Sequence, residues 1–214
     1  MRRIEISHQI EMGMKTYPGL PEPRAEVLMD YDSSKYNGLS EFYIASLHCC
    51  GNTGTYVDAP IHRYRNATDL AGLSLDRLAH IPVVVIDATA HEAIGPDTFK
   101  HLKLEGKAVL FRTEWSRHWR TPEYFNPNPH LTQEACDALL DKGIAMAGID
   151  SVNIDSLADL SRPAHTTLLK AGIPICEHMT NLSAIPDEGG YIHAVPIAWV
   201  GGATFPVRAY IIAD

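Results

Sequence analysis

The sequence predicts a single α/β domain built on a mixed β-sheet. Two observations point to this fold class. Apolar, β-branched runs at residues 82–87 and 108–112 are typical of strands that are buried on both faces. Later in the chain, helix-like segments alternate with short apolar runs, an order that favours parallel strands joined by helices. A chain of 214 residues is long enough for one large domain, so we expect residues 1–214 to form it alone.

The first half of the chain contains strand and turn signals in sequence. Residues 3–7 alternate between polar and apolar side chains and predict a first strand. Residues 17–23 hold three prolines and a glycine, which favour a loop. Residues 41–48 predict a strand that leads into residues 52–62, a turn rich in small residues.

The second half begins with a well-marked helix. Thr132 is suited to cap it, because a threonine hydroxyl accepts a hydrogen bond from a free N–H of the first helical turn. Gly143 predicts its end, and residues 144–149 predict the strand that follows.

A second helix–strand unit follows the first. Pro163 predicts the start of a short helix and Gly172 its end, with a strand at residues 173–176. Strand, helix and strand at this spacing indicate a right-handed parallel crossover. Residues 192–200 and 207–213 predict the last strands.

Composition disfavours several classes of partner. Eighteen basic and 26 acidic residues give a net charge of −8, without a Lys/Arg cluster, which disfavours nucleic acid and anionic membranes. The N-terminus lacks the apolar stretch of a signal peptide, and no apolar run reaches the ~18 residues of a membrane span. The four cysteines show no CxxC spacing, so we expect reduced thiols and a cytoplasmic protein.

Chemically capable side chains occur at three places. Asp58 and His62 lie four residues apart in the turn at residues 52–62, stiffened by Pro60. His165 opens the second predicted helix, and Glu177 follows the strand after it, where α/β folds usually place their ligands. Carboxylates and imidazoles together make a plausible site for Zn, Mn or a similar divalent ion, although spacing alone is weak evidence.

Residues 52–62 resemble the signature His-x-Gly-Thr-His-x-Asp-x-Pro-x-His of the cyclase family, which includes bacterial kynurenine formamidases and isatin hydrolases. Further segments are similar to that family in the same order along nearly the whole chain. They are residues 17–21, 111–119, 128–132, 148–151, 164–169 and 175–177.

The resemblance implies a swivelling β/β/α-like fold and a homodimer or homotetramer. It implies that Asp58 contacts the metal, that His62 acts as general acid and base, and that His165 and Glu177 are ligands of the second metal position. The family's other two histidine ligands are replaced here by Asn52 and Tyr56.

This replacement has a physical consequence. An amide oxygen is a weak ligand, and a phenol normally has to lose a proton at a pKa of ~10 before it binds a metal well. We therefore expect one divalent ion at most, Zn or Mn, or none, with Tyr56 pointing at it. His48, four residues before Asn52, is an alternative replacement ligand. Asn52 and Trp115 are predicted substrate-binding residues, although core packing explains Trp115 equally well.

Three functions are compatible with these residues. The first is a metal-dependent hydrolase of C–N bonds in a small amide, such as an N-formyl aryl amine or a cyclic amide. In it a metal-activated water attacks and His62 is the general acid and base. The second is a cyclase, dehydratase or lyase in which Tyr56 is an acid or hydrogen-bond donor. The third is a metal-free binding member of the family, favoured by the two missing histidines.

Overall fold

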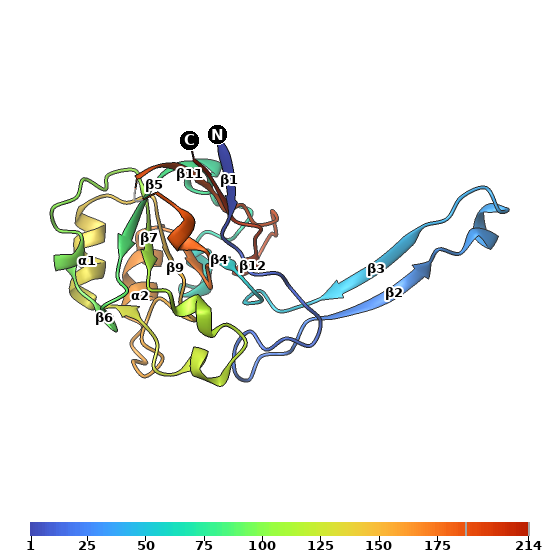
Figure 1. Cartoon of the computed structure of the whole chain (residues 1–214), viewed down its shortest axis with the longest axis horizontal. Helices are drawn as coiled ribbons and strands as arrows, with labels where there is room; N and C mark the ends of the chain where they lie inside the picture. Colours follow the sequence, from blue (N-terminus) through green and yellow to red (C-terminus); the bar gives the residue numbers. More distant parts are fainter. Residues whose placement is uncertain (187, 214) are drawn as a thin grey trace.

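The fold is organised around one large mixed sheet (Figure 1). The structure, a computed structural model, describes residues 1–186 and 188–213, with Glu188 described through its backbone only. Among these residues nine strands form the sheet in the order β1-β13-β11-β5-β7-β9-β10-β4-β12. The strands are β1 (Arg2–Glu5), β4 (Tyr56–Asp58), β5 (Ala79–Asp87), β7 (Ala108–Arg112), β9 (Met146–Ile149), β10 (Ile175–Glu177), β11 (Glu188–His193), β12 (Thr204–Pro206) and β13 (Tyr210–Ala213).

The centre of the sheet is parallel and its flanks are antiparallel. β5, β7, β9 and β10 run parallel to one another, whereas β4 pairs antiparallel with β10, and β11 pairs antiparallel with β5. Val84 and Ile86 of β5 contact one apolar core, and the alternate residues Val83 and Val85 contact another. Burial on both faces explains why the apolar runs at 82–87 and 108–112 predicted strands correctly.

Two α-helices of the described chain, α1 (Gln133–Asp141) and α2 (Pro163–Lys170), contribute to the same one of these two cores. The Thr132 hydroxyl accepts a hydrogen bond from the Ala135 N–H at 3.2 Å, which confirms the predicted cap of α1. Gly143 and Gly172 follow the helices with φ of 65° and 73°, the left-handed conformation that glycine adopts most readily. The parallel pairing of β9 with β10 confirms the predicted parallel crossover through α2.

Shorter elements connect these parts. They are the strands β6 (Ala93–Ile94) and β8 (His130–Leu131) and the 3₁₀ helices η1 (Ser33–Tyr36), η2 (Pro60–His62), η3 (Leu75–Arg77), η4 (Pro96–Thr98), η5 (Trp115–His118), η6 (Pro122–Phe125) and η7 (Leu182–Ala184). No helix in the described residues is both long and apolar enough to cross a membrane. The four cysteines are free thiols, and Cys136 and Cys176 are buried.

A β-hairpin projects away from the body of the molecule (Figure 1). It consists of β2 (Arg24–Asp30) and β3 (Tyr43–His48), which pair only with each other in the described chain. β3 confirms the strand predicted at 41–48, but β2 was not predicted, because its Val27 and Leu28 are adjacent apolar residues that break the alternation.

Two sequence predictions need correction. Residues 52–62 are not irregular throughout: Tyr56–Asp58 forms β4 inside the sheet, and Pro60–His62 forms η2. The strand predicted at residues 192–200 is wrong beyond His193, where β11 ends. Pro196 lacks the N–H that a ladder needs, and the following apolar side chains up to Val200 are exposed in a loop.

Candidate metal centre

Strand pairing brings distant acidic residues to one face of the sheet. In the antiparallel pair of β4 and β10, Tyr56 lies opposite Glu177 and Asp58 lies opposite Ile175. Side chains alternate along a strand, so Tyr56, Asp58 and Glu177 share the same face. Ile175 belongs to the core cluster that also contains residues of α2, and α2 places His165 over this face.

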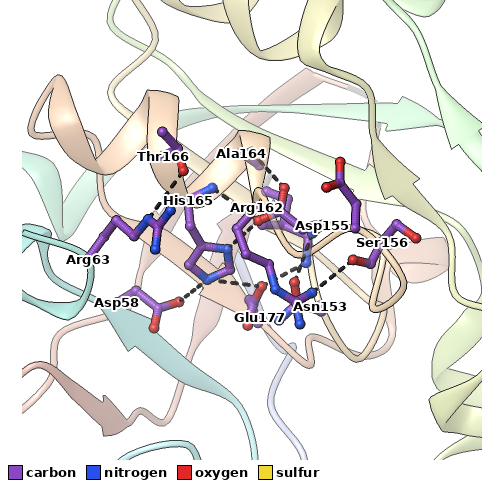
Figure 2. A network of polar contacts seen from close by, with 12 residues as sticks. Asp58, Arg63, Asn153, Asp155, Ser156, Arg162, Ala164, His165, Thr166 and Glu177 are labelled. Atoms are coloured by element: carbon purple, nitrogen blue, oxygen red, sulfur yellow. Dashed lines mark hydrogen bonds and ion pairs between the residues drawn. The ribbon is translucent and has the colours of Figure 1, made fainter.

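Asp58 lies between two imidazoles. Its Oδ1 is 3.7 Å from Nε2 of His62, and its Oδ2 is 3.8 Å from Nε2 of His165 (Figure 2). These three side chains place one potential ligand atom each within 4.8 Å of one another. The Asp58 side chain is 0% exposed, and neither of its oxygens has a hydrogen-bond partner among the described residues. Two buried, unpaired carboxylate oxygens that face two imidazoles are suited to a cation.

Glu177 joins this group through His165. Its Oε1 lies 3.7 Å from Nε2 of His165 and also accepts a hydrogen bond from the Ile154 N–H at 2.7 Å. Its Oε2 accepts a hydrogen bond from the Tyr56 hydroxyl at 2.5 Å. The structure therefore brings Asp58, His62, His165 and Glu177 into one site, and each close pair among these four contains Asp58 or His165.

Burial and negative charge dominate the electrostatics of the site. Burial, and then the charge of Glu177, raise the pKa of Asp58 well above its usual value. Burial raises the pKa of Glu177 as well, although the charge of His165 opposes this. Burial lowers the pKa of His165, but the charge of Glu177 and the hydrogen bond to Asp155 outweigh it and raise that pKa to about 9. Without a metal, this imidazole is the group that carries positive charge among the acids.

His62 has the opposite electrostatic character. Burial, followed by the nearby charges of His165 and Arg63, lowers its pKa to about 4. Its side chain nevertheless keeps 34% exposure. The ring is therefore neutral at pH 7 and reachable by a ligand, and it can accept a proton.

Asp155 is a site residue that the sequence interpretation missed. Its Oδ2 lies 2.6 Å from Nδ1 of His165, and its carboxylate also accepts hydrogen bonds from the first N–H groups of α2, those of Ala164 and His165. A carboxylate on the second ring nitrogen fixes the orientation of an imidazole ligand. One signal was present: Arg162, directly before Pro163, cannot cap the helix, so a carboxylate from elsewhere had to do so.

Asn52 and Tyr56 form a polar chain that ends on Glu177. The Asn52 side chain hydrogen-bonds the Tyr56 hydroxyl, which donates in turn to Glu177. The Asn52 Oδ1 accepts a hydrogen bond from Thr204 at 3.1 Å. Burial, and then the charges of Glu177 and Asp58, raise the pKa of Tyr56 well above its usual value, so the phenol keeps its proton. Tyr56 is thus a hydrogen-bond donor to the Glu177 carboxylate.

Trp115 and His48 lie outside this group. The Trp115 indole N–H donates to the Tyr124 carbonyl at 3.0 Å, and Trp115 is not among the described residues that line the cavity beside the site. Its contact with substrate stays a prediction without support from that cavity. His48 lies on the projecting hairpin, 3.2 Å from the Ser46 hydroxyl and 4.0 Å from Glu26, so it does not replace the lost ligand.

A cavity of about 450 Å³ opens beside the acidic group. Its chemically active lining comprises Asn52, Tyr56, His62, Arg63, Arg162 and His165. The predicted loop at residues 17–23 supplies part of its wall through Tyr17, Pro18 and Leu20. A cavity of this size, with a few convergent polar groups and perturbed pKa values, is suited to a small ligand.

Comparison with known proteins defines the class. Residues 4–156 match the Cyclase family model, whose description is "Putative cyclase". A kynurenine formamidase of Bacillus thuringiensis subsp. konkukian (strain 97-27) is 32% identical over 210 residues, which cover 97% of this chain and 96% of that protein. A kynurenine formamidase of Salinibacter ruber (strain DSM 13855 / M31) is 29% identical over 99% of this chain and 97% of its own.

Solved structures agree with the fold. Isatin hydrolase A from Labrenzia aggregata superposes with a TM-score of 0.85 at 23% identity, covering 99% of this chain and 93% of that one. A structure titled "The Structure Of Potential Metal-Dependent Hydrolase With Cyclase Activity" has a TM-score of 0.81 at 27% identity, covering 98% and 96%. The chain belongs to the cyclase family, and its mixed α/β fold is the one these neighbours share.

The residues present fit a divalent ion. Asp58 offers two buried oxygens that accept no hydrogen bond from the described residues, and Nε2 of His165 lies 3.8 Å from Asp58 and 3.7 Å from Glu177. Carboxylate oxygen with imidazole nitrogen is a common donor set for zinc and for related first-row metals.

Proposed function

We propose that this protein is a metal-dependent hydrolase that cleaves the C–N bond of a small amide, such as an N-formyl aryl amine or a cyclic amide. One observation carries the proposal: the buried, unpaired Asp58 carboxylate faces His62 and His165 beside a cavity of small-ligand size. The family supports it, since relatives over nearly the full length are kynurenine formamidases, and a structural neighbour is titled a metal-dependent hydrolase.

Asp58, His165 and Glu177 would hold the ion, which we propose to be a single Zn²⁺ or Mn²⁺. When bound, such an ion polarises a carbonyl group and lowers the pKa of water, which supplies the electrophile and the nucleophile of hydrolysis. Asp155 keeps Nδ1 of His165 engaged, so that Nε2 of His165 is the nitrogen directed into the site. His165, whose pKa is raised to about 9, has to lose a proton before its Nε2 can bind the ion.

His62 would move the protons. Its neutral ring can take a proton from the attacking water, because its Nε2 is directed at Asp58 and its side chain is partly open to the cavity. The resulting imidazolium lies 3.7 Å from the Asp58 carboxylate, which stabilises it until it gives the proton to the departing amine nitrogen. Pro18 and Leu20 of the cavity wall would exclude water from the apolar part of the amide.

Metal content and turnover test the proposal together. We expect the purified, metal-loaded protein to hold about one divalent ion per chain and to hydrolyse N-formylaniline. Asp58→Asn removes the charge of a proposed ligand, and His165→Gln removes an imidazole ligand. Both variants should lose the ion and reduce kcat/KM by at least about 100-fold. His193→Gln is the matched control, because His193 stacks on Tyr210 on other strands of the sheet.

Full metal content and full activity in Asp58→Asn and His165→Gln would overturn the proposal. Failure of the wild-type protein to bind Zn²⁺ or Mn²⁺ would also overturn it and favour the metal-free binding member of the family. Elemental analysis measures the metal content of the wild-type protein and of both variants, and it does not depend on the choice of substrate.

We further propose that the protein is a homo-oligomer, with the projecting β2–β3 hairpin packing on a second copy of the chain. The hairpin carries exposed large apolar side chains, and the body of the molecule presents a second apolar segment at residues 195–200. An isolated two-stranded hairpin is marginal in water, so burial against another chain would account for its length and composition.

A further inference from the structure

Two arginines, Arg63 and Arg162, line the cavity at its mouth. Arg63 directly follows His62, and Arg162 directly precedes α2, which carries His165. Figure 2 shows their guanidinium groups on either side of the His165 ring. Both positive charges therefore lie beside the proposed catalytic residues, although neither arginine touches the buried carboxylates.

Neither guanidinium forms a direct ion pair with an acid of the described chain, although Arg162 interacts at longer range with the charge of Asp159. Arg63 donates to the Thr166 hydroxyl at 3.2 Å and to the Ser161 carbonyl at 3.4 Å, and Arg162 donates to the Ser156 carbonyl at 2.8 Å. These acceptors are neutral, and among the described residues neither arginine has a carboxylate oxygen within 4.0 Å. Other arginines do pair with acids, as Arg120 does with Glu11 at 2.8 Å and Arg208 with Glu5 at 2.8 Å.

The neutral contacts hold the guanidinium groups and leave donors free. A guanidinium has five N–H donors in a planar fork that matches a carboxylate. Arg63 uses Nε and Nη2, which leaves its Nη1, and Arg162 uses Nη1, which leaves Nη2 and Nε. Arg162 also has a φ of 52°, in the left-handed region that residues with a side chain seldom occupy. Backbone strain of this kind concentrates at functional sites.

The cavity is therefore polarised from mouth to base. Tyr56 and His165 line the base of the cavity, and the acids Glu177 and Asp58 are buried behind them. The two arginines, which are more exposed, line its mouth. A ligand that fits this pattern presents a neutral, polarisable group to the base and one negative charge to the mouth. Its body would lie against the apolar wall formed by Pro18 and Leu20.

We infer that Arg63 and Arg162 form a carboxylate-binding subsite, and that the substrate is a small amide bearing one carboxylate beside the bond that is cleaved. This inference rests on the proposed amide hydrolysis. It assigns the specificity of that reaction to two residues outside the metal centre.

Kinetics with a charged and a neutral substrate test this subsite. The probes are 2-formamidobenzoate and N-formylaniline, which differ by the carboxylate. We expect wild-type protein to prefer the carboxylate at least tenfold in kcat/KM, and Arg63→Gln and Arg162→Gln each to reduce that preference about tenfold, mainly through KM. Arg65→Gln is the matched control, since Arg65 is exposed on the same loop and does not line the cavity.

Binding of benzoate, measured by calorimetry on the metal-loaded protein, gives a second readout that needs no turnover. Benzoate should bind wild type more tightly than benzamide does. In the double variant Arg63→Gln/Arg162→Gln the two compounds should bind with similar affinity. An unchanged substrate preference with unchanged benzoate binding would overturn the subsite. If wild type hydrolyses neither amide but binds benzoate through the arginines, the proposed reaction fails and the subsite stands.

Discussion

At the scale of single residues, Tyr56 shows how a side chain that is a poor metal ligand can still order the site. Its hydroxyl receives a hydrogen bond from Asn52 and donates to Glu177 at 2.5 Å, so a phenol proton faces this carboxylate oxygen. The phenol is fully buried and keeps its proton because burial raises its pKa. Tyr56 holds Oε2 of Glu177 and leaves Oε1 3.7 Å from His165, and we therefore expect it to act as a positioning residue.

Removing this hydroxyl should weaken the site without unfolding the protein. We expect Tyr56→Phe to reduce metal affinity or kcat about 10- to 100-fold, the effect typical of losing a group that orients a ligand. A metal titration should show a lower affinity or kinetics should show a lower kcat, while KM for the neutral amide changes little. Tyr64→Phe is the control, because it also removes a partly buried tyrosine hydroxyl, one that donates to the Thr166 carbonyl at 2.7 Å and not to a carboxylate of the site. Unchanged metal affinity and turnover in Tyr56→Phe would contradict this role.

At the scale of elements, the β2–β3 hairpin stands apart from the sheet that carries the site. Val27 and Leu28 are adjacent on β2, where the pairing with β3 is irregular, and they are 51% and 56% exposed. Ile44 and Leu47 on β3 are similarly exposed. Apolar side chains on both faces of a projecting hairpin gain little stability unless another surface covers them.

The oligomeric state should depend on these side chains. We expect wild type to be a dimer or tetramer by light scattering at micromolar concentration, and the double variant Ile44→Asp/Leu47→Asp to shift it toward monomer, because each aspartate would be buried unpaired in the interface. Leu75→Asp, at an exposed position on the body in η3, is the control and should leave the mass unchanged. A monomeric wild-type protein would contradict the proposed assembly.

At the scale of the whole molecule, neutral histidines within the fold link stability to pH. His8 stacks on Trp119 with ring centroids 4.1 Å apart, and its Nε2 is buried without a hydrogen-bond partner in the part of the chain that the structure describes. Burial lowers the pKa of His8 to about 4. An imidazole in the unfolded chain titrates near pH 6.5. Between these values the unfolded state binds one more proton than the folded state does.

The sign of the effect follows from this difference. Stability from His8 is present above pH ~6.5 and is lost as the pH falls toward about 4, with a slope of at most ~1.4 kcal/mol per pH unit for one proton. We expect His8→Gln to show a shallower loss of unfolding free energy between pH 7 and pH 5 in urea titrations. His91→Gln, at an exposed turn, is the control. Parallel pH profiles of wild type and His8→Gln would contradict the prediction.

Local signals predicted the elements that local physics decides. Thr132 caps α1, glycines in the left-handed conformation follow both helices, and the apolar run at 108–112 coincides with β7. The same signals failed where solvent exposure or pairing with another strand decides whether a segment forms a strand. Residues 195–200 are apolar but find no strand partner, and β4 has three residues that become a strand only because β10 and β12 lie on either side of it.

The sequence by itself determined the family and pointed to four of the site's side chains. Asp58 and His62 stand in the signature at residues 52–62, and His165 and Glu177 stand in the later segments that are similar to the family. Only the tertiary structure decided how they meet. Strand pairing sets Tyr56 opposite Glu177, 121 residues away, and a loop carboxylate, Asp155, both caps α2 and orients His165. Only the fold likewise shows that Arg63 and Arg162 lie beside one cavity. Electrostatic interactions depend on distance in space, which the positions of the two arginines along the chain do not reveal.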